Sequence, residues 1–98
     1  MTFLETVRDL ALKEPKTQTE RLIKLMEETG ELAVEIGIRQ KLSGFKDKEE
    51  GKDGVQGEAV DIILVALSIF FKDGGSVNDF IALALKKSAR WQAHQENL

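Results

Sequence analysis

One stretch of the sequence, a helix predicted from Val55 or Glu58 to Lys72, is apolar on nearly every side. Every residue after Glu58 and before Lys72 is apolar except Asp61 and Ser68. A helix that is apolar all round is buried all round, and a chain of 98 residues has little protein with which to cover it. We therefore expect a dimer or a higher oligomer. We also expect the ionised Asp61 to need a cationic partner or a metal ion.

Three further helices are predicted from the 3.6-residue apolar period and from helix-start chemistry. The first is expected from Thr2 to Lys13, and the second from Thr17 to about Leu42. The last begins after Ser76 and runs toward Gln92 or beyond. Each start has a hydroxyl residue followed three positions later by an acid, in Thr2-x-x-Glu5, Thr17-x-x-Glu20 and Ser76-x-x-Asp79.

The stretch 43–57 breaks the apolar period and is expected to be a loop. It holds four glycines and a charged run, and so long a loop in a small domain is commonly either disordered or a functional lid. The tail 94–98 is polar and is expected to fray. These features together predict an all-α fold, with four helices in a single domain over residues 1–98.

Composition limits the kinds of partner. A net charge of −3, with acids and bases interspersed, argues against a nucleic-acid-binding protein, which usually has a basic excess. The chain has no cysteine, so it holds neither a disulfide nor a thiolate metal site. Its charged, amphipathic start does not match a signal peptide, and the apolar run 62–71 is too short to cross a membrane. We expect a cytoplasmic domain that binds neither nucleic acid nor membrane.

Carboxylates recur at helical spacing on two of the predicted helices. Glu28 and Glu31 share one face of the second helix, with Glu35 one turn further on. Glu58 and Asp61 repeat the same spacing on the third helix. If the two faces meet, they form an all-oxygen, negatively charged site of the kind that Mg²⁺ or Mn²⁺ prefers.

These acids also have a plainer interpretation. Acids at helical spacing most often form a solvated face, and the run Glu27–Glu31 taken alone fits that description. Asp61 favours the metal site, because it lies on a helix too apolar for a surface helix. Zinc and di-iron centres are not expected, because the only histidine is His94, near the C-terminal end.

Lys86 and Arg90 are one turn apart on the last predicted helix and can point the same way. Phosphate favours Arg as a fork and Lys as a point charge, so both residues are candidates for binding phosphate oxygens. The alternative is a solvated helix end whose positive charges complement the helix dipole.

The motif Glu27-Glu28-x-x-Glu31 followed by Glu58-x-x-Asp61 resembles the EExxE…ExxD motif of the MazG-like, all-α nucleoside triphosphate pyrophosphohydrolases. The resemblance extends to the helix layout and to the last helix. There, the segment 86–91, a lysine followed by an Arg-Trp pair, is similar to the family's Lys…Arg-aromatic segment. It implies a four-helix MazG-like unit that assembles as a homodimer or a homotetramer.

The resemblance also implies roles for the motif residues. The Mg²⁺ ligands would be four carboxylates, those of Glu28, Glu31, Glu58 and Asp61. Glu27 would support the site or orient the attacking water, and the cations at positions 86 and 90 would contact the triphosphate. The implied reaction is hydrolysis of a (d)NTP between the α and β phosphates, which gives (d)NMP and pyrophosphate. The usual role is housecleaning of the nucleotide pool.

The base of the substrate is left open. The first helix lacks the tryptophan or histidine that some relatives place near the base, and the loop 43–57 has no aromatic residue except Phe45. Nucleotides like dCTP or dUTP and damaged nucleotides are all compatible with the sequence, whereas nothing points to phosphoribosyl-ATP. The alternative function is a non-catalytic helical dimerisation or adaptor module that binds a nucleotide or a protein partner.

Overall fold

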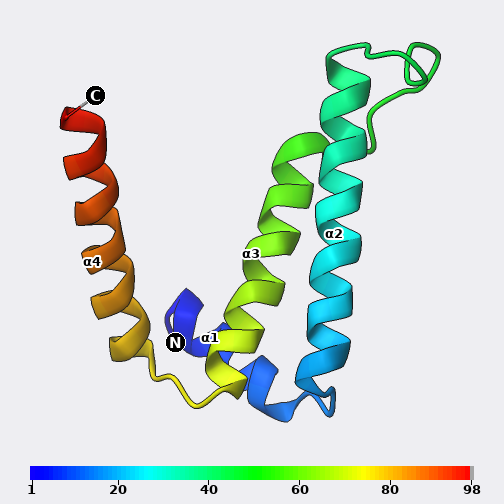
Figure 1. The fold of residues 1–98 in the computed structure, drawn as a ribbon. Helices are drawn as coiled ribbons and strands as arrows, with labels where there is room; N and C mark the ends of the chain where they lie inside the picture. The colour runs from blue at the N-terminus through cyan, green and yellow to red at the C-terminus, as the bar shows by residue number, and fades with distance from the viewer. Residues whose placement is uncertain (98) are drawn as a thin grey trace.

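The computed structural model describes residues 1–97, and this part of the chain is all-α, with four helices and no strand. Helix α2 and helix α3 lie side by side and run in opposite directions, while α1 crosses near one end of the pair (Figure 1). This confirms the predicted fold class at the level of four helices. The helices are α1 (Phe3–Lys13), α2 (Gln18–Arg39), α3 (Gly54–Lys72) and α4 (Val77–Glu96).

The predicted helix starts are formed as expected. At α2, the Thr17 hydroxyl accepts a hydrogen bond from the Glu20 N–H (3.1 Å), and the Glu20 carboxylate accepts one from the Thr17 N–H (3.0 Å). Ser76 and Asp79 make the same two bonds at the start of α4. At α1, the Thr2 hydroxyl accepts a hydrogen bond from the backbone N–H three residues further along the chain. Because each cap satisfies backbone donors that the helix leaves free, the caps fix where the helices begin.

Two helix ends differ from the predicted ones. Helix α2 ends at Arg39 rather than near Leu42, because Lys41 adopts a left-handed backbone (φ 53°) that stops the helix. The tail 94–98 was expected to fray, but α4 continues to Glu96, so that prediction was wrong for the residues up to there, and position 98 lies outside the described residues. Two side-chain bonds support this last turn: Gln92 donates to Glu96 (3.1 Å), and Asn97 donates to a backbone carbonyl of the turn before it (2.9 Å).

The core lies where α1 crosses α3, and α4 reaches it only through its first turns. Val7, Ala11, Leu67 and Phe71 are buried there. Side chains from the end of α3 and the start of α4 close the core at its edge, including the ring of Phe80, which packs edge-on against that of Phe70 at 5.5 Å. The core therefore joins one end of α3 to α1 and leaves the other end of α3 to pack on α2.

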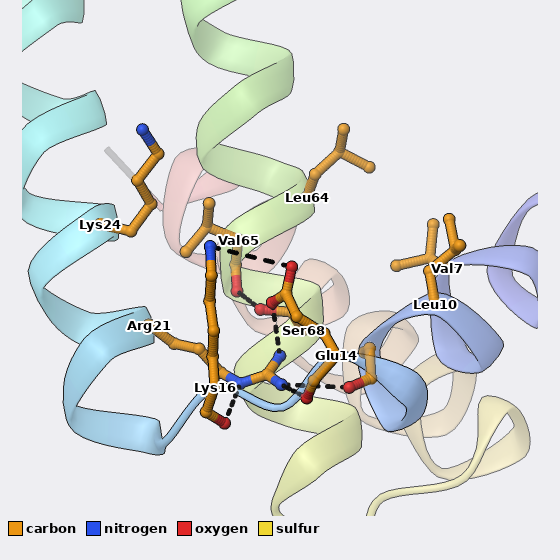
Figure 2. A pocket seen from close by; sticks show the side chains of 10 residues that line it. Val7, Leu10, Glu14, Lys16, Arg21, Lys24, Leu64, Val65 and Ser68 are labelled. Atoms are coloured by element: carbon orange, nitrogen blue, oxygen red, sulfur yellow. Dashed lines mark hydrogen bonds and ion pairs between the residues drawn. The ribbon is translucent and has the colours of Figure 1, made fainter.

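A buried arginine fixes the corner between α1 and α2 (Figure 2). Only 1% of Arg21 is exposed. Its guanidinium donates to the backbone carbonyls of Ala11 (3.1 Å), Glu14 (3.1 Å) and Lys16 (3.3 Å) and lies 3.6 Å from the Glu14 carboxylate. A cation at a helix C-terminus satisfies free carbonyls and complements the helix dipole. Arg21 therefore closes the end of α1 and ties it to α2.

Helix α4 stands apart from the α2–α3 pair (Figure 1). Among its described residues none is buried. On α3, the only buried residues are Leu67 and Phe71, while Val60 and Ile63 are each 51% exposed. One chain therefore leaves part of the surface of α3 uncovered, although its composition predicts burial on all sides.

The length of α3 also bears on the membrane. The helix has 19 residues and a mean hydropathy of 1.7, so by length and composition alone it could cross a bilayer. The apolar run used for the sequence prediction is shorter than this helix. The core helix of a soluble protein passes the same test, so the absence of a membrane stays a prediction.

Candidate metal centre

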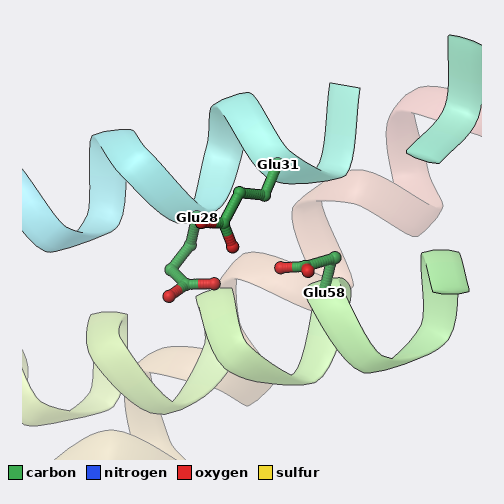
Figure 3. Close-up of side chains that lie close together, drawn as sticks. All are labelled: Glu28, Glu31 and Glu58. Atoms are coloured by element: carbon green, nitrogen blue, oxygen red, sulfur yellow. The ribbon is translucent and has the colours of Figure 1, made fainter. Parts of the chain in front are cut away.

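Three glutamates meet between α2 and α3 (Figure 3). Glu28 and Glu31 come from α2 and Glu58 comes from α3, and one oxygen of each lies within 4.8 Å of the other two. The three-residue spacing puts Glu28 and Glu31 on adjacent turns of one face. Because α3 begins at Gly54, Glu58 falls in its second turn, opposite that face. The antiparallel helix pair thus brings together acids that are 30 residues apart in sequence.

Two oxygens of this cluster need a partner. Glu28 is only 6% exposed, and Glu58 is half-buried. Within residues 1–97, Oε2 of Glu28 and Oε2 of Glu58 receive no hydrogen bond. A buried carboxylate oxygen without a donor is costly, so these atoms are satisfied by a proton that the two acids share or by a cation. An all-oxygen set at this spacing fits a hard divalent cation such as Mg²⁺ or Mn²⁺.

The two buried acids have opposite pKa shifts. Burial raises the pKa of Glu58 to about 7, with further contributions from a hydrogen bond with Glu28 and from the negative charges of Glu31, Glu28 and Asp61. The Lys24 ammonium, hydrogen-bonded to Glu28, lowers the pKa of that carboxyl. At neutral pH Glu58 is therefore protonated in a large share of molecules. It is the acid that a bound cation has to deprotonate.

Asp61 lies outside the cluster of three. It is exposed on α3, one turn beyond Glu58, and its charge contributes to the raised pKa of Glu58. The expectation that Asp61 is enclosed by apolar protein is not met within one chain. The reason is that no helix of the same chain covers the part of α3 where the neighbouring Val60 and Ile63 are also exposed.

Glu27 is exposed and is not one of the three clustered acids. Its carboxylate lies 3.7 Å from the Lys24 ammonium, which also lies 3.1 Å from Glu28. The structure thus places Glu27 beside the cluster, through a shared cation, and outside the group of three.

Lys86 and Arg90 are not brought to the glutamates within one chain. Both are exposed on α4, and α4 stands apart from α2 (Figure 1). If these two cations bind a substrate at the cluster, α4 has to come from a second copy.

Two side chains of α2, those of Glu35 and Arg39, bind the loop that follows the helix. The Gly51 N–H donates to both oxygens of Glu35 (2.9 and 3.1 Å), and Arg39 pairs with Glu50 at 2.8 Å. Glu35 continues the acidic line of α2, but here it braces the loop and is not part of the cluster. The loop covers residues 40–53, because α3 begins earlier than the sequence indicated.

Lys24 is a residue that the sequence prediction missed. A lysine four residues before Glu28 is a familiar helix pair, and that spacing could have found it. Lys24 also lines a cavity of about 280 Å³ between α1, α2 and α3, next to the buried Arg21 (Figure 2). It thus stands between the acidic cluster and a largely apolar cavity.

Comparison of the chain with models of protein families, with curated proteins and with solved structures finds no match. The resemblance to MazG-like enzymes therefore rests on the motif residues and the helix order, and it stays a prediction.

Proposed function

We propose that the chain is a Mg²⁺-dependent nucleoside triphosphate pyrophosphohydrolase that converts a (d)NTP into (d)NMP and pyrophosphate in the cytoplasm. The observation that carries the proposal is the meeting of Glu28, Glu31 and Glu58, with two buried oxygens that lack a donor. This arrangement supports a cation site where the motif resemblance expects one.

In the proposed reaction, water attacks the α-phosphorus, and the bond to the oxygen that bridges the α and β phosphates breaks. The cation, when bound, neutralises phosphate charge and lowers the pKa of a bound water. Glu28, Glu31 and Glu58 would hold it, and Glu58 would give up its proton as it binds. Asp61, exposed one turn away, would complete the set from the rim. Glu27, which shares Lys24 with Glu28, would orient the attacking water.

We further propose that the enzyme is a homodimer or a homotetramer. Two observations support this: α3 exposes apolar side chains that one chain does not cover, and α4 carries Lys86 and Arg90 away from its own cluster. A second copy could cover the exposed apolar side chains of α3. Its α4 could also bring Lys86 and Arg90 to the cluster of the first copy, where the two cations would contact the triphosphate.

The test is a panel of nucleoside triphosphates incubated with the protein and Mg²⁺, with release of pyrophosphate and monophosphate followed. We expect turnover of at least one nucleotide and its loss when Mg²⁺ is chelated. Glu31→Gln and Asp61→Asn should each lower kcat by about a hundredfold or more, because each removes a charge that holds the cation. Glu49→Gln, an exposed loop acid, is the matched control and should keep full activity. A panel without any cleavage would exclude the enzyme.

The second candidate is a non-catalytic helical dimerisation or adaptor module that binds a nucleotide or a protein partner. It is favoured by the exposed apolar side chains on α2 and α4, among them Met26, Leu85 and Trp91. The two candidates differ in their response to Mg²⁺, because a ligand that binds only the native state raises its stability. A melting temperature that does not change with Mg²⁺, with or without a non-hydrolysable nucleotide, would favour the adaptor.

A further inference from the structure

We propose that Lys24 is the counter-ion of the metal-free centre, that a divalent cation displaces its ammonium group from Glu28, and that the freed ammonium then pairs with a phosphate oxygen of the substrate. This inference rests on the proposed function. It assigns to Lys24 a substrate-binding role that changes with the occupancy of the centre.

The geometry of the pair is asymmetric. The Lys24 Nζ lies 3.1 Å from Oε1 of Glu28, and the two side chains are 47% and 8% exposed. The carboxylate is thus held inside the helix pair, whereas the ammonium reaches it from one turn earlier on a flexible stem. When the pair breaks, Lys24 moves and Glu28 stays.

The ammonium and a divalent cation compete for the same carboxylate. Glu28 is one of the three acids whose oxygens lie within 4.8 Å of one another, so a cation held by all three takes up its charge. Two positive charges at such a separation repel each other. A bound cation therefore weakens the ion pair between Glu28 and Lys24 in two ways. It binds the Glu28 carboxylate in place of Lys24, and its positive charge repels the Lys24 ammonium.

A cavity next to Lys24 gives its freed ammonium room to move. Lys24 lines the cavity between α1, α2 and α3, together with Lys16 and Arg21 (Figure 2). The Arg21 guanidinium donates to three backbone carbonyls, and its remaining nitrogen is buried 3.6 Å from the Glu14 carboxylate. Lys16 also pairs with Glu14, at 3.9 Å. Lys24 is therefore the cation on this rim whose closest partner the metal removes, and its longer contact with the exposed Glu27 (3.7 Å) remains. A phosphate oxygen on the cation offers it a new anion.

The experiment compares the full-length wild type with Lys24→Met, which removes the charge and keeps the length of the side chain. Lys24→Arg keeps the charge, and Lys87→Met removes an exposed charge from α4 as the control. Mg²⁺ affinity is measured by calorimetry at fixed ionic strength, and KM and kcat are measured on a cleaved nucleotide. We expect Lys24→Met to bind Mg²⁺ about two- to fivefold more tightly and to have a higher KM. Lys24→Arg should stay near the wild type in both, and Lys87→Met should be unchanged.

The outcomes separate this inference from the proposed function. A wild type that binds no Mg²⁺ overturns the proposed metal centre. A wild type that binds Mg²⁺, with equal or weaker binding in Lys24→Met, overturns the counter-ion role alone. Tighter binding with an unchanged KM overturns the contact with phosphate. If Lys24→Met does not fold, the wild type still gives a test. Its Lys24 ε-methylene NMR signal should move as Mg²⁺ fills the site, and a stationary signal contradicts the displacement.

Discussion

Glu28 and Glu58 carry the same side chain and lie within one cluster, yet their protonation differs. Glu28 has a cation one turn away, whereas Glu58 has only acids around it. A carboxyl next to a positive charge ionises more easily, and a carboxyl buried among acids retains its proton. At neutral pH the cluster therefore holds a proton at Glu58 in a large share of molecules, and a divalent cation bound there would have to replace it.

The proton on Glu58 makes the metal-free stability depend on pH. In the folded chain the pKa of Glu58 is about 7, against 4.5 for the free side chain. Between these values the folded state binds more protons than the unfolded state, so the free energy of unfolding falls as pH rises from 4.5 to 7. The lowered pKa of Glu28 acts in the opposite direction and only below 4.5. Urea unfolding in EDTA at pH 5.5 and pH 8 measures this fall. Glu58→Gln should reduce it, and a wild type equally stable at both pH values contradicts it.

Replacing Arg21 should destabilise the fold. Arg21→Met leaves buried backbone carbonyls at the end of α1 without donors, and we expect a loss of about 3 kcal/mol in the free energy of unfolding. Arg8→Met is the control, because Arg8 is exposed and pairs only with Asp9 at 3.9 Å. It should change stability by less than about 0.5 kcal/mol. Urea unfolding measures both, and equal effects would show that Arg21 contributes little to the corner.

At the scale of elements, α2 combines three tasks along one helix. Its first turn closes against α1 through Arg21, its middle supplies two acids of the cluster, and its last turns hold the loop 40–53 through Glu35 and Arg39. Because these features follow one another along a rigid helix, the loop and the cluster keep a fixed relation. A change in the tie at Glu35 should therefore affect the loop first.

The tie between Glu35 and the loop can be tested on its own. Glu35→Ala removes the acceptor of the Gly51 N–H, and we expect faster hydrogen exchange at that amide and a stability loss of about 1 kcal/mol. Glu49→Ala, in the same loop, should leave the exchange of Gly51 unchanged. Exchange followed by NMR distinguishes the two variants, and an unaltered Gly51 rate in Glu35→Ala would mean that other contacts hold the loop.

The sequence carries enough information for the elements and for much of the cluster. Helix starts at Thr17 and Ser76 depend on neighbours three residues away, and the spacing of Glu28 and Glu31 is also local, so both could be predicted. The exposure of Asp61 could not, because it depends on which helices cover α3. The contacts of Arg21 join groups up to ten residues apart across a turn. In the sequence they correspond to a single arginine without a recognisable spacing, so they could not be predicted.

At the scale of the whole molecule, one chain leaves many large apolar side chains exposed. Exposed large hydrophobic side chains occur on all four helices. On α3 they lie on the helix whose composition predicts complete burial. The folded chain thus has the surface of a subunit, and a second copy is the partner that we propose for it.

The assembly can be tested by light scattering after size-exclusion chromatography without detergent. We expect the mass of two or four chains. Ile63→Asp places a charge on the exposed side of α3 and should shift the mass toward one chain, because a charge buried in an interface without a partner is costly. Leu42→Asp, at an exposed position in the loop 40–53, is the control and should keep the wild-type mass. A wild type with the mass of one chain would contradict the proposed assembly. A protein that stays in solution only with detergent would favour a membrane location for α3.

The narrow attachment of α4 has a consequence for how the chain opens. Because α4 meets the rest of the chain through its first turns, near Phe80, the hydrogen bonds of its far half are local ones along the helix itself. Short isolated helices are marginal in water, so this half forms a separate cooperative unit of low local stability. The helix that its residues form, Trp91 included, therefore opens more readily than the core. A partner that binds only the closed helix suppresses this opening, so the affinity of the assembly is lowered according to the share of chains in which this half is open.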